Sequence, residues 1–349
     1  MKKLPGRYVA DGREAAGGMG DVIFCDDTHL DRKVAIKFIS DERNRHRILD
    51  ELKALLKMRS KHVVQVFDVV SAGDELGIVQ EYIEGTDLSE IELPFASPEL
   101  YMRALWQIAA GIADIHAIDV IHRDIKPNNM RLDPEGIVKI YDFGLARDEG
   151  HDAKTRGFVG TPYFAAPELF RFADVRFTKA VDVYAFGVTA LYLATKSLPA
   201  QLMAIPPQLT GTNFFGTTAV PVPVIQILNQ CLKDEPEARP AMAEVRDILA
   251  RYLLKDKHEA VVVFQQRSSS LNATSREVRL NLPNMGKLRI LYDGLTFNAL
   301  DVSGDVYINN RRAVENMELP GSCVVALGPD QSRDRRYITF DLSQPEIVL

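Results

Sequence analysis

The sequence predicts an α+β fold of two lobes, a five-stranded antiparallel lobe and a mainly helical lobe, followed by an all-β sandwich. Three observations predict it. Short runs of β-branched residues separated by turn residues fill the first part of the chain. From Ser97 to about Leu254 the apolar spacing is helical, interrupted by a Pro-rich loop from Leu198 to Pro223. Beyond Lys255 short strand patterns return, separated by Asn, Gly, Asp and Pro.

The elements of the first lobe are expected between residues 7 and 83. They are two strands joined by a Gly-rich turn over residues 8–27, a strand at 33–39, a helix at 42–58, and strands at 62–70 and 76–83. The helix is expected because its apolar residues recur on one face, at Ile48, Leu52, Leu55 and Leu56. The helical lobe follows over residues 84–254. Its first helix should begin at Ser97, a capping residue placed ahead of Pro98 and Glu99.

The composition is that of a soluble globular protein, with 46% hydrophobic and 26% charged residues among 349. A formal net charge of −6 argues against nucleic-acid binding, which favours a basic balance. Three widely separated cysteines, Cys25, Cys231 and Cys323, suit buried free thiols in a reducing compartment. The N-terminus lacks a signal peptide, and the longest apolar stretch, residues 180–195, carries Asp182 and is too short to span a membrane. We therefore expect a cytoplasmic protein in which this stretch is a buried helix.

One segment carries most of the chemistry. It runs from residue 122 to residue 144 and contains HRDIKPNN followed by DFG. The carboxylate of Asp124 suits a base that receives a hydroxyl proton, and Asn129 and Asp142 supply the oxygen ligands that Mg²⁺ prefers. The segment resembles the catalytic and metal-binding loops of the eukaryotic-type protein kinases, and the compact loops resemble the bacterial members. By that resemblance Lys126 steadies the γ-phosphate and marks the serine/threonine branch.

The resemblance covers residues 7–254 and implies a bilobal protein kinase fold for residues 1–254. It implies a non-specific serine/threonine protein kinase that uses ATP and Mg²⁺ and acts on protein substrates. Lys37 would contact the α- and β-phosphates, oriented by Glu51, with Asp50 as the alternative. The residues assigned to the nucleotide are Gly17, Gly18, Gly20, Val22, Ala35, Lys37, Glu81, Ile83 and Asp87, next to Gln80 at the gatekeeper position. Asp87 would bind the ribose; a solvated loop carboxylate is the alternative.

Two positions depart from the kinase pattern. Ala15 stands where the first glycine of the Gly-rich turn is usual, and Arg131 where a leucine usually forms the floor of the adenine pocket. The stem and guanidinium plane of Arg131 can stack on a purine, or Met130 or Leu132 takes that place. Both departures concern nucleotide affinity rather than the catalytic groups.

The resemblance also implies regulation and support. Arg123 could pair with a phosphate on the activation segment, where autophosphorylation is expected and the candidate sites are Thr155 and Thr161. Glu168 would pair with Arg239 in a structural ion pair. Asp182 would hold the backbone of the catalytic loop.

The region 255–349 is expected to form a β-sandwich of about 90 residues, in which the Ser268–Ser270 run is a loop. It weakly resembles a forkhead-associated (FHA) domain, through Ser303-Gly304-Asp305, Asn309-Asn310 and Leu319-Pro320-Gly321. Arg267 could stand for the family's first arginine, but residues 284–287 lack the Ser, Arg and His that grip phosphothreonine. We expect an FHA-like interaction or regulatory domain without that binding and with a protein partner; an unrelated β-sandwich is the alternative.

The kinase-like motifs leave three functions open. A pseudokinase acting as a nucleotide-binding scaffold usually lacks a core residue, whereas Lys37, Asp124, Asn129 and Asp142 are all present here. A small-molecule kinase usually lacks the Ala166-Pro167-Glu168 element. The sequence therefore favours an active protein kinase.

Overall fold

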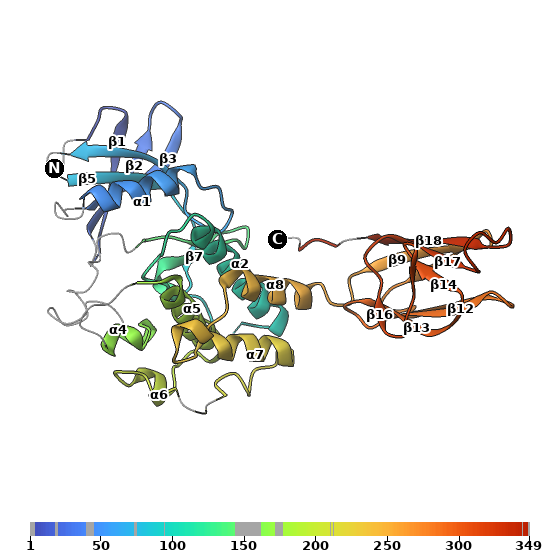
Figure 1. The fold of residues 1–349 in the computed structure, drawn as a ribbon. Helices are drawn as coiled ribbons and strands as arrows, with labels where there is room; N and C mark the ends of the chain where they lie inside the picture. Colours follow the sequence, from blue (N-terminus) through green and yellow to red (C-terminus); the bar gives the residue numbers. More distant parts are fainter. Residues whose placement is uncertain are drawn as a thin grey trace. The chain divides into compact units, whose positions relative to one another are not determined.

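The computed structural model describes the chain except for residues 1–3, 18–19, 40–44, 73–74, 94, 144–161, 172–176, 210, 212, 344 and 348–349. The chain divides into two compact units, residues 1–249 and 250–348. The division falls inside helix α8 (Met242–Leu253). Figure 1 shows the first unit as a strand-rich lobe and a helical lobe, and the second unit, after the end of α8, as β-strands.

The first lobe contains an antiparallel sheet of five strands in the order β1-β2-β3-β5-β4. The strands are β1 (Tyr8–Gly17), β2 (Gly20–Asp27), β3 (Arg32–Ile39), β4 (Val66–Ala72) and β5 (Glu75–Glu81), and the helix α1 (Arg45–Lys57) is the single helix described between them. The apolar face of α1, at Ile48, Leu52 and Leu55, is buried in one cluster with Val66 and Ile78 of the sheet. This confirms the predicted lobe.

The fourth strand of this sheet begins later than expected. Residues 62–65 were predicted as strand, but Val64 donates its N–H to Ile140 O at 2.8 Å, and Ile140 donates to His62 O at 2.9 Å. These residues therefore pair with the short strand β8 (Val138–Ile140) of the second lobe, and β4 starts at Val66. Period-two alternation cannot tell which partner a strand segment will choose.

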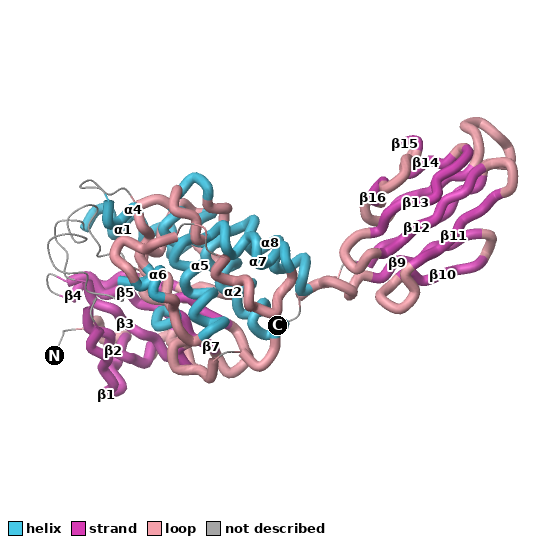
Figure 2. The backbone as a smooth tube through the Cα atoms, turned by 90° about the horizontal axis from the view of Figure 1, so that it is seen from below, coloured by secondary structure: helices cyan, strands magenta, loops and turns pink. Residues whose placement is uncertain are grey.

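The second lobe is mainly helical, and Figure 2 separates its helices from the strands of the first lobe. Its elements are β6 (Thr86–Asp87), α2 (Pro98–Ala117), β7 (Met130–Leu132), β8, α4 (Glu168–Arg171), α5 (Lys179–Thr195), α6 (Ala200–Met203), α7 (Val222–Cys231) and α8. Short 3₁₀ turns lie at Pro127–Asn129, Pro162–Phe164 and Pro236–Ala238. The strands β6, β7 and β8 form a small sheet.

Two predictions for the helical lobe are confirmed and one needs correction. Ser97 caps α2, its hydroxyl accepting a hydrogen bond from Leu100 N at 3.2 Å. The apolar stretch forms α5, a helix buried over most of its length. The expected loop over residues 198–223 contains α6 and the start of α7, because proline is compatible with the N-cap and the first turn of a helix as well as with loops. No helix of the described chain is long and apolar enough to cross a membrane.

The second unit is built from two antiparallel sheets. One has the order β10-β9-β18-β17-β14-β15 and the other β11-β12-β13-β16. The strands are β9 (Glu259–Phe264), β10 (Arg267–Leu271), β11 (Glu277–Leu282), β12 (Gly286–Tyr292), β13 (Phe297–Gly304), β14 (Val306–Ile308), β15 (Arg311–Arg312), β16 (Met317–Glu318), β17 (Cys323–Leu327) and β18 (Arg336–Ser343). Both sheets contribute to one buried core that includes Val262, Leu288, Ile290 and Phe340. Two sheets on a shared core are the layering of a sandwich.

One expectation for this unit was wrong. The Ser268–Ser270 run was predicted as a loop, yet it lies in β10, paired along its length with β9. The turn between them, Gln265 and Gln266, has positive φ at both residues, 49° and 62°. Pairing of an edge strand depends on main-chain groups and a turn, so exposed serines carry no pattern that reveals it. The cysteines Cys25, Cys231 and Cys323 are buried free thiols, as predicted.

Candidate active site

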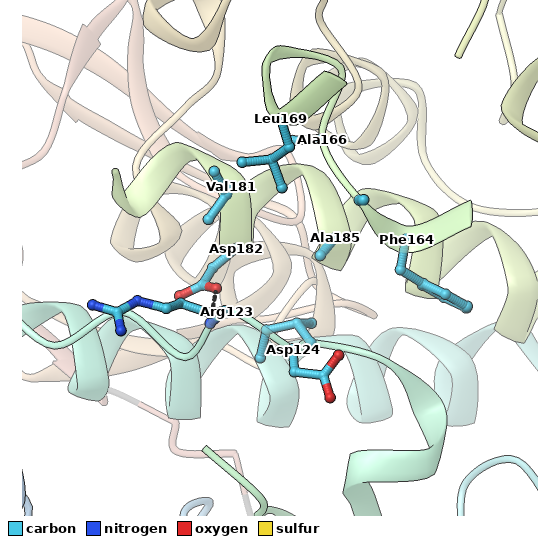
Figure 3. Close-up of a pocket in the computed structure, with 10 residues that line it drawn as sticks. Arg123, Asp124, Phe164, Ala166, Leu169, Val181, Asp182 and Ala185 are labelled. Carbon is cyan, nitrogen blue, oxygen red and sulfur yellow. Dashed lines mark hydrogen bonds between the residues drawn. The ribbon is translucent and has the colours of Figure 1, made fainter. Parts of the chain in front are cut away.

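One buried carboxylate binds the backbone of the loop over residues 121–129. Asp182 of α5 is 1% exposed and accepts hydrogen bonds from the backbone N–H groups of His122 and Arg123, both at 2.8 Å. The ring of His116 adds a third contact at 3.0 Å. Figure 3 shows Asp182 reaching from its helix to the Arg123 backbone. The supporting role predicted for Asp182 is confirmed.

Two residues of the site have a backbone that L-residues seldom adopt. Arg123 and Asp142 have φ values of +67° and +64°, in the left-handed region. Such residues cost of order 1–3 kcal/mol and persist only where their surroundings fix them. The buried hydrogen bonds of Asp182 supply that restraint at Arg123.

The carboxylate of Asp124 is clamped by an amide and an ammonium group. Its side chain is 8% exposed, and Oδ2 lies 2.9 Å from Lys126 Nζ and 2.7 Å from Asn129 Nδ2. Asn129 donates a second hydrogen bond, to the backbone oxygen of Asp124, at 2.8 Å. A carboxylate held in this way can take a proton from a hydroxyl group, while the cation beside it compensates negative charge.

His122 joins this loop to the segment that carries Asp142. Burial lowers the pKa of His122, so its imidazole is neutral. Nε2 lies 3.0 Å from Tyr141 O, and Asp124 N lies 3.3 Å from Nδ1. A neutral ring satisfies both contacts when Nε2 carries the proton and donates to Tyr141 O. The loops of Asp124 and Asp142 are thereby fixed to one another.

The oxygen atoms predicted to hold a metal fit that role. Both N–H groups of the Asn129 amide are used on Asp124, so its Oδ1 faces elsewhere as an acceptor. Asp142 uses Oδ1 in an ion pair with Lys37, so the Oδ2 atom of Asp142 remains as a second acceptor. Within the described residues neither Asn129 Oδ1 nor Asp142 Oδ2 receives a hydrogen bond from protein. Hard oxygens of this kind suit Mg²⁺.

The expected pair of Lys37 and Glu51 is not formed in this structure. Lys37, which is 6% exposed, pairs with Asp142. Glu51 pairs instead with Arg123, at 3.1 Å. The side chains of Glu51 and Arg123 are 15% and 6% exposed. The expected pair does not form because Lys37 has the carboxylate of Asp142 within contact distance, and Glu51 has the guanidinium of Arg123. Asp50, the alternative, lies exposed and pairs with Lys53.

The strand residues assigned to the nucleotide lie together in the sheet. Val22 of β2 is opposite Lys37 of β3, and Ala35 of β3 is opposite Gln80 of β5. Gly17 faces Gly20 across the β1–β2 hairpin, and Ala15 faces Val22. Gly18, Thr155 and Thr161 lie outside the described residues.

After β5 the chain passes Ile83 and reaches Asp87. The side chain of Glu81 is engaged by Lys139 at 2.7 Å and by Gln65 N at 3.2 Å. Ile83 O accepts from Arg131 NH1 at 3.1 Å. Asp87 pairs with Arg131 across β6 and β7, with Nε 2.8 Å from Oδ1. Arg131 thus lies beside the residues assigned to adenine and ribose, and its guanidinium is engaged by protein groups.

Tyr141 is a site residue that the sequence analysis did not single out. Its hydroxyl lies 2.8 Å from Asp87 Oδ1 and 2.8 Å from Asn128 O. Burial, with the neighbouring Asp87 hydrogen bond, raises the pKa of Tyr141, so the phenol stays protonated and donates. The available signal was its position directly before Asp142.

A small cavity of about 30 Å³ lies between the loop that carries Asp124 and the segment at residues 164–169. That is room for about one water molecule. Figure 3 shows Phe164, Ala166 and Leu169 on one side of it and Asp124 on the other. Behind this segment Glu168 and Arg239 form the predicted ion pair, with two contacts of 2.8 Å.

Comparisons with known proteins agree with this geometry. A family model described as the protein kinase domain matches residues 15–249. The chain is 33% identical over 254 residues to the serine/threonine-protein kinase PknA of Corynebacterium glutamicum, covering 69% of this chain and 50% of that protein. It is 27% identical over 290 residues to a probable serine/threonine-protein kinase of Dictyostelium discoideum, covering 79% and 58%. Against PrkC of Bacillus subtilis the identity is 31% over 207 residues, covering 57% and 32%. The chain thus spans about half the length of the curated relatives it matches, or less.

Proposed function

The chain belongs to the protein kinase family, and we propose that it is a serine/threonine protein kinase that transfers the γ-phosphoryl group of ATP to protein hydroxyl groups. One observation carries the proposal: Asp124 is held by Lys126 and Asn129, beside the pair of Lys37 and Asp142. A proton acceptor, a metal-binding amide and carboxylate, and a phosphate-binding cation are the groups this transfer needs. All four kinds occur within one site.

Each residue has a defined task in the transfer. Asp124 receives the proton of the attacking hydroxyl, and Lys126 balances the negative charge beside it. When the nucleotide binds, Lys37 would exchange the carboxylate of Asp142 for phosphate oxygens. Asn129 Oδ1 and the Asp142 carboxylate would hold Mg²⁺, which would supply positive charge beside the phosphate oxygens.

Two features support protein substrates with serine or threonine. The segment carrying Ala166-Pro167-Glu168 is anchored by the ion pair of Glu168 with Arg239, whose side chain is 0% exposed. This segment and Asp124 line the same small cavity, so the segment lies close to the proposed proton acceptor. Lys126, which forms an ion pair with Asp124, is the residue by which the sequence resembles the serine/threonine branch of the family. The printed names of PknA and PrkC as serine/threonine-protein kinases agree with this choice.

We also propose control by autophosphorylation of the activation segment, with Thr155 as the first candidate site and Thr161 as the second candidate. Arg123 is the basic group that we expect to receive such a phosphate, which would compete with Glu51 for the guanidinium. Glu51 would then be able to pair with Lys37. Mass spectrometry after incubation with ATP and Mg²⁺ tests this: Thr155 should be modified, and full activity with Thr155 unmodified would contradict it.

A transfer assay with radiolabelled ATP and a general protein substrate tests the activity. Asp124→Asn and Lys37→Ala should each abolish transfer to within background. Asp119→Asn is the matched control, because Asp119 is a 91% exposed carboxylate whose contact is with Lys179. Retained transfer in both site variants would sink the mechanism. A wild-type protein that binds ATP without transferring phosphate would instead be a nucleotide-binding scaffold.

For residues 255–349 we propose an FHA-like domain that binds a protein partner without recognising phosphothreonine. Its two antiparallel sheets on one core support the sandwich, and the absence of Ser, Arg and His in residues 284–287 supports the loss of phosphate binding. Calorimetry with a phosphothreonine peptide should show no heat of binding. Binding in the low micromolar range would overturn the proposed loss.

A further inference from the structure

Three side chains meet at the sugar end of the proposed nucleotide site. Arg131 Nε and the Tyr141 hydroxyl each lie 2.8 Å from the same oxygen, Oδ1 of Asp87. Arg131 NH1 also donates to Ile83 O at 3.1 Å, and its guanidinium lies 5.5 Å from the centre of the Tyr141 ring. Asp87, Arg131 and Tyr141 are called the sugar-end cluster below. They join three segments of the chain that meet beside the metal-binding residue Asp142.

The cluster changes what Asp87 can offer to a ligand. Its Oδ1 accepts from Arg131 Nε and lies within hydrogen-bond distance of the Tyr141 hydroxyl, which can give its one proton to Oδ1 or to Asn128 O. In the described part of the chain its Oδ2 accepts no hydrogen bond. The Asp87 side chain is 23% exposed, and Oδ2 is the oxygen on which a ligand hydroxyl would not compete with protein donors. A ribose presents two adjacent hydroxyl groups, and a carboxylate with both oxygens available could accept from both. Asp87 therefore offers the sugar one oxygen rather than two, which favours a hydrogen bond from one of the two hydroxyl groups.

Tyr141 connects this contact to the metal-binding residues. Its backbone N–H donates to Asn129 O at 2.9 Å, and its carbonyl oxygen accepts from His122 Nε2 at 3.0 Å. Asp142 is the next residue in the chain. A movement of the phenol away from Asp87 therefore acts on the peptide that positions both Asn129 and Asp142.

We propose that Arg131 and Tyr141 determine sugar selectivity: they restrict Asp87 to a single ribose hydroxyl, and Tyr141 couples that contact to the metal-binding residues. This inference rests on the proposed function, since it needs ATP in this site. Arg131 and Tyr141 are positioning residues, because they act on the sugar through Asp87. The ligand class is a ribonucleoside triphosphate distinguished by one hydroxyl group.

Binding measurements with three nucleotides test the selectivity. Dissociation constants are measured by calorimetry with Mg²⁺ for ATP, 2′-deoxy-ATP and 3′-deoxy-ATP. Wild-type protein should bind one deoxy analogue about tenfold more weakly than ATP and the other about as well, since one hydrogen bond to a charged group is lost in one case only. In Arg131→Leu combined with Tyr141→Phe both carboxylate oxygens are available, so both analogues should bind about tenfold more weakly than ATP.

The controls separate this inference from the function it rests on. Tyr192→Phe removes a phenol outside the cluster and should keep the wild-type pattern, and thermal unfolding checks that each variant is folded. Wild-type protein that binds ATP but loses both analogues equally, or neither, would overturn the inference alone. Failure of wild-type protein to bind ATP would overturn the proposed function as well.

A second readout tests the coupling through Tyr141. Tyr141→Phe removes one oxygen without changing the ring, so a purely structural role would leave the metal dependence of transfer unchanged. We expect the Mg²⁺ concentration at half-maximal transfer to rise several-fold in Tyr141→Phe and to stay at the wild-type value in Tyr192→Phe. An unchanged Mg²⁺ dependence in Tyr141→Phe would remove the coupling from the proposal.

Discussion

The phosphate end and the sugar end of the proposed nucleotide site are stabilised in different ways. At the phosphate end, buried groups bind the main chain: Asp182 is 1% exposed and His122 is fully buried. At the sugar end, partly exposed side chains bind one another. In the pair of Arg131 and Asp87 the side chains are 29% and 23% exposed. Water competes for the second kind of contact but not for the first. The phosphate end should therefore tolerate little change, and the sugar end should be tunable.

The largest effect is expected at Asp182. Asp182→Ala leaves two buried N–H groups and the ring of His116 without their acceptor. We expect a loss of about 3–5 kcal/mol in the free energy of unfolding, as for other buried charged partners, together with loss of transfer. Urea denaturation measures the first quantity. Asp119→Ala, on an exposed carboxylate, should stay within about 0.5 kcal/mol of wild type. A loss below about 1 kcal/mol at Asp182 would break the contrast between the two ends.

A buried pair away from the nucleotide tests whether burial is the cause. Arg239→Ala removes a side chain that is 0% exposed and leaves Glu168 without its two contacts of 2.8 Å. The expected loss in the free energy of unfolding is about 3 kcal/mol. The matched control is Arg276→Ala, because Arg276 and Asp256 are 43% and 37% exposed; it should cost less than about 1 kcal/mol. Equal losses in the two variants would show that exposure does not decide the effect.

A third expectation concerns pH. Burial lowers the pKa of His122 in the folded protein, below its ordinary value of 6.5. The unfolded chain therefore takes up a proton at a higher pH than the folded chain, so His122 favours folding above about pH 6.5 and disfavours it progressively below. One such proton contributes at most about 1.4 kcal/mol per pH unit.

His122→Gln should flatten the fall of the free energy of unfolding between about pH 6.5 and 5, measured by urea denaturation at each pH. Some slope will remain, because burial also lowers the pKa of His62 and His258. His29→Gln, at an exposed histidine, is the control. An identical slope in wild type and His122→Gln would contradict the neutral, buried imidazole.

The same contrast explains what the sequence could predict. Asp124, Asn129 and Asp142 lie in one short segment, and their tasks follow from residue type and order. The contacts of Asp124 with Lys126 and Asn129 span two and five residues, so local geometry fixes them. The strands of the first sheet were predictable for a similar reason, since turns and apolar alternation are local signals.

Other contacts could not be predicted because they depend on packing between distant segments. The pair of Glu51 and Arg123 joins residues 72 positions apart. Which carboxylate Lys37 meets is decided by the positions of α1 and the Asp142 loop, and no residue pattern encodes that distance. Tyr141 was missed since it lies just past the end of β8, and residue type alone does not show which partners its hydroxyl will meet. Strand β10 was missed because it pairs with β9 through main-chain hydrogen bonds, which its serine side chains do not reveal.

The smallest effect is expected at Lys139, on the margin of the sugar end. Its ammonium group lies 2.7 Å from the Glu81 carboxylate, and their side chains are 17% and 27% exposed. Lys139→Met keeps the length of the side chain, and Glu81 retains its contact with Gln65 N. The loss in the free energy of unfolding should stay below about 1 kcal/mol, since partly exposed ion pairs contribute little. The dissociation constant of ATP should change by less than about twofold, because the Glu81 backbone stays bonded to Gln65 O at 2.9 Å. A tenfold weaker affinity would show that this pair, too, positions the nucleotide, and that the sugar end is as intolerant as the phosphate end.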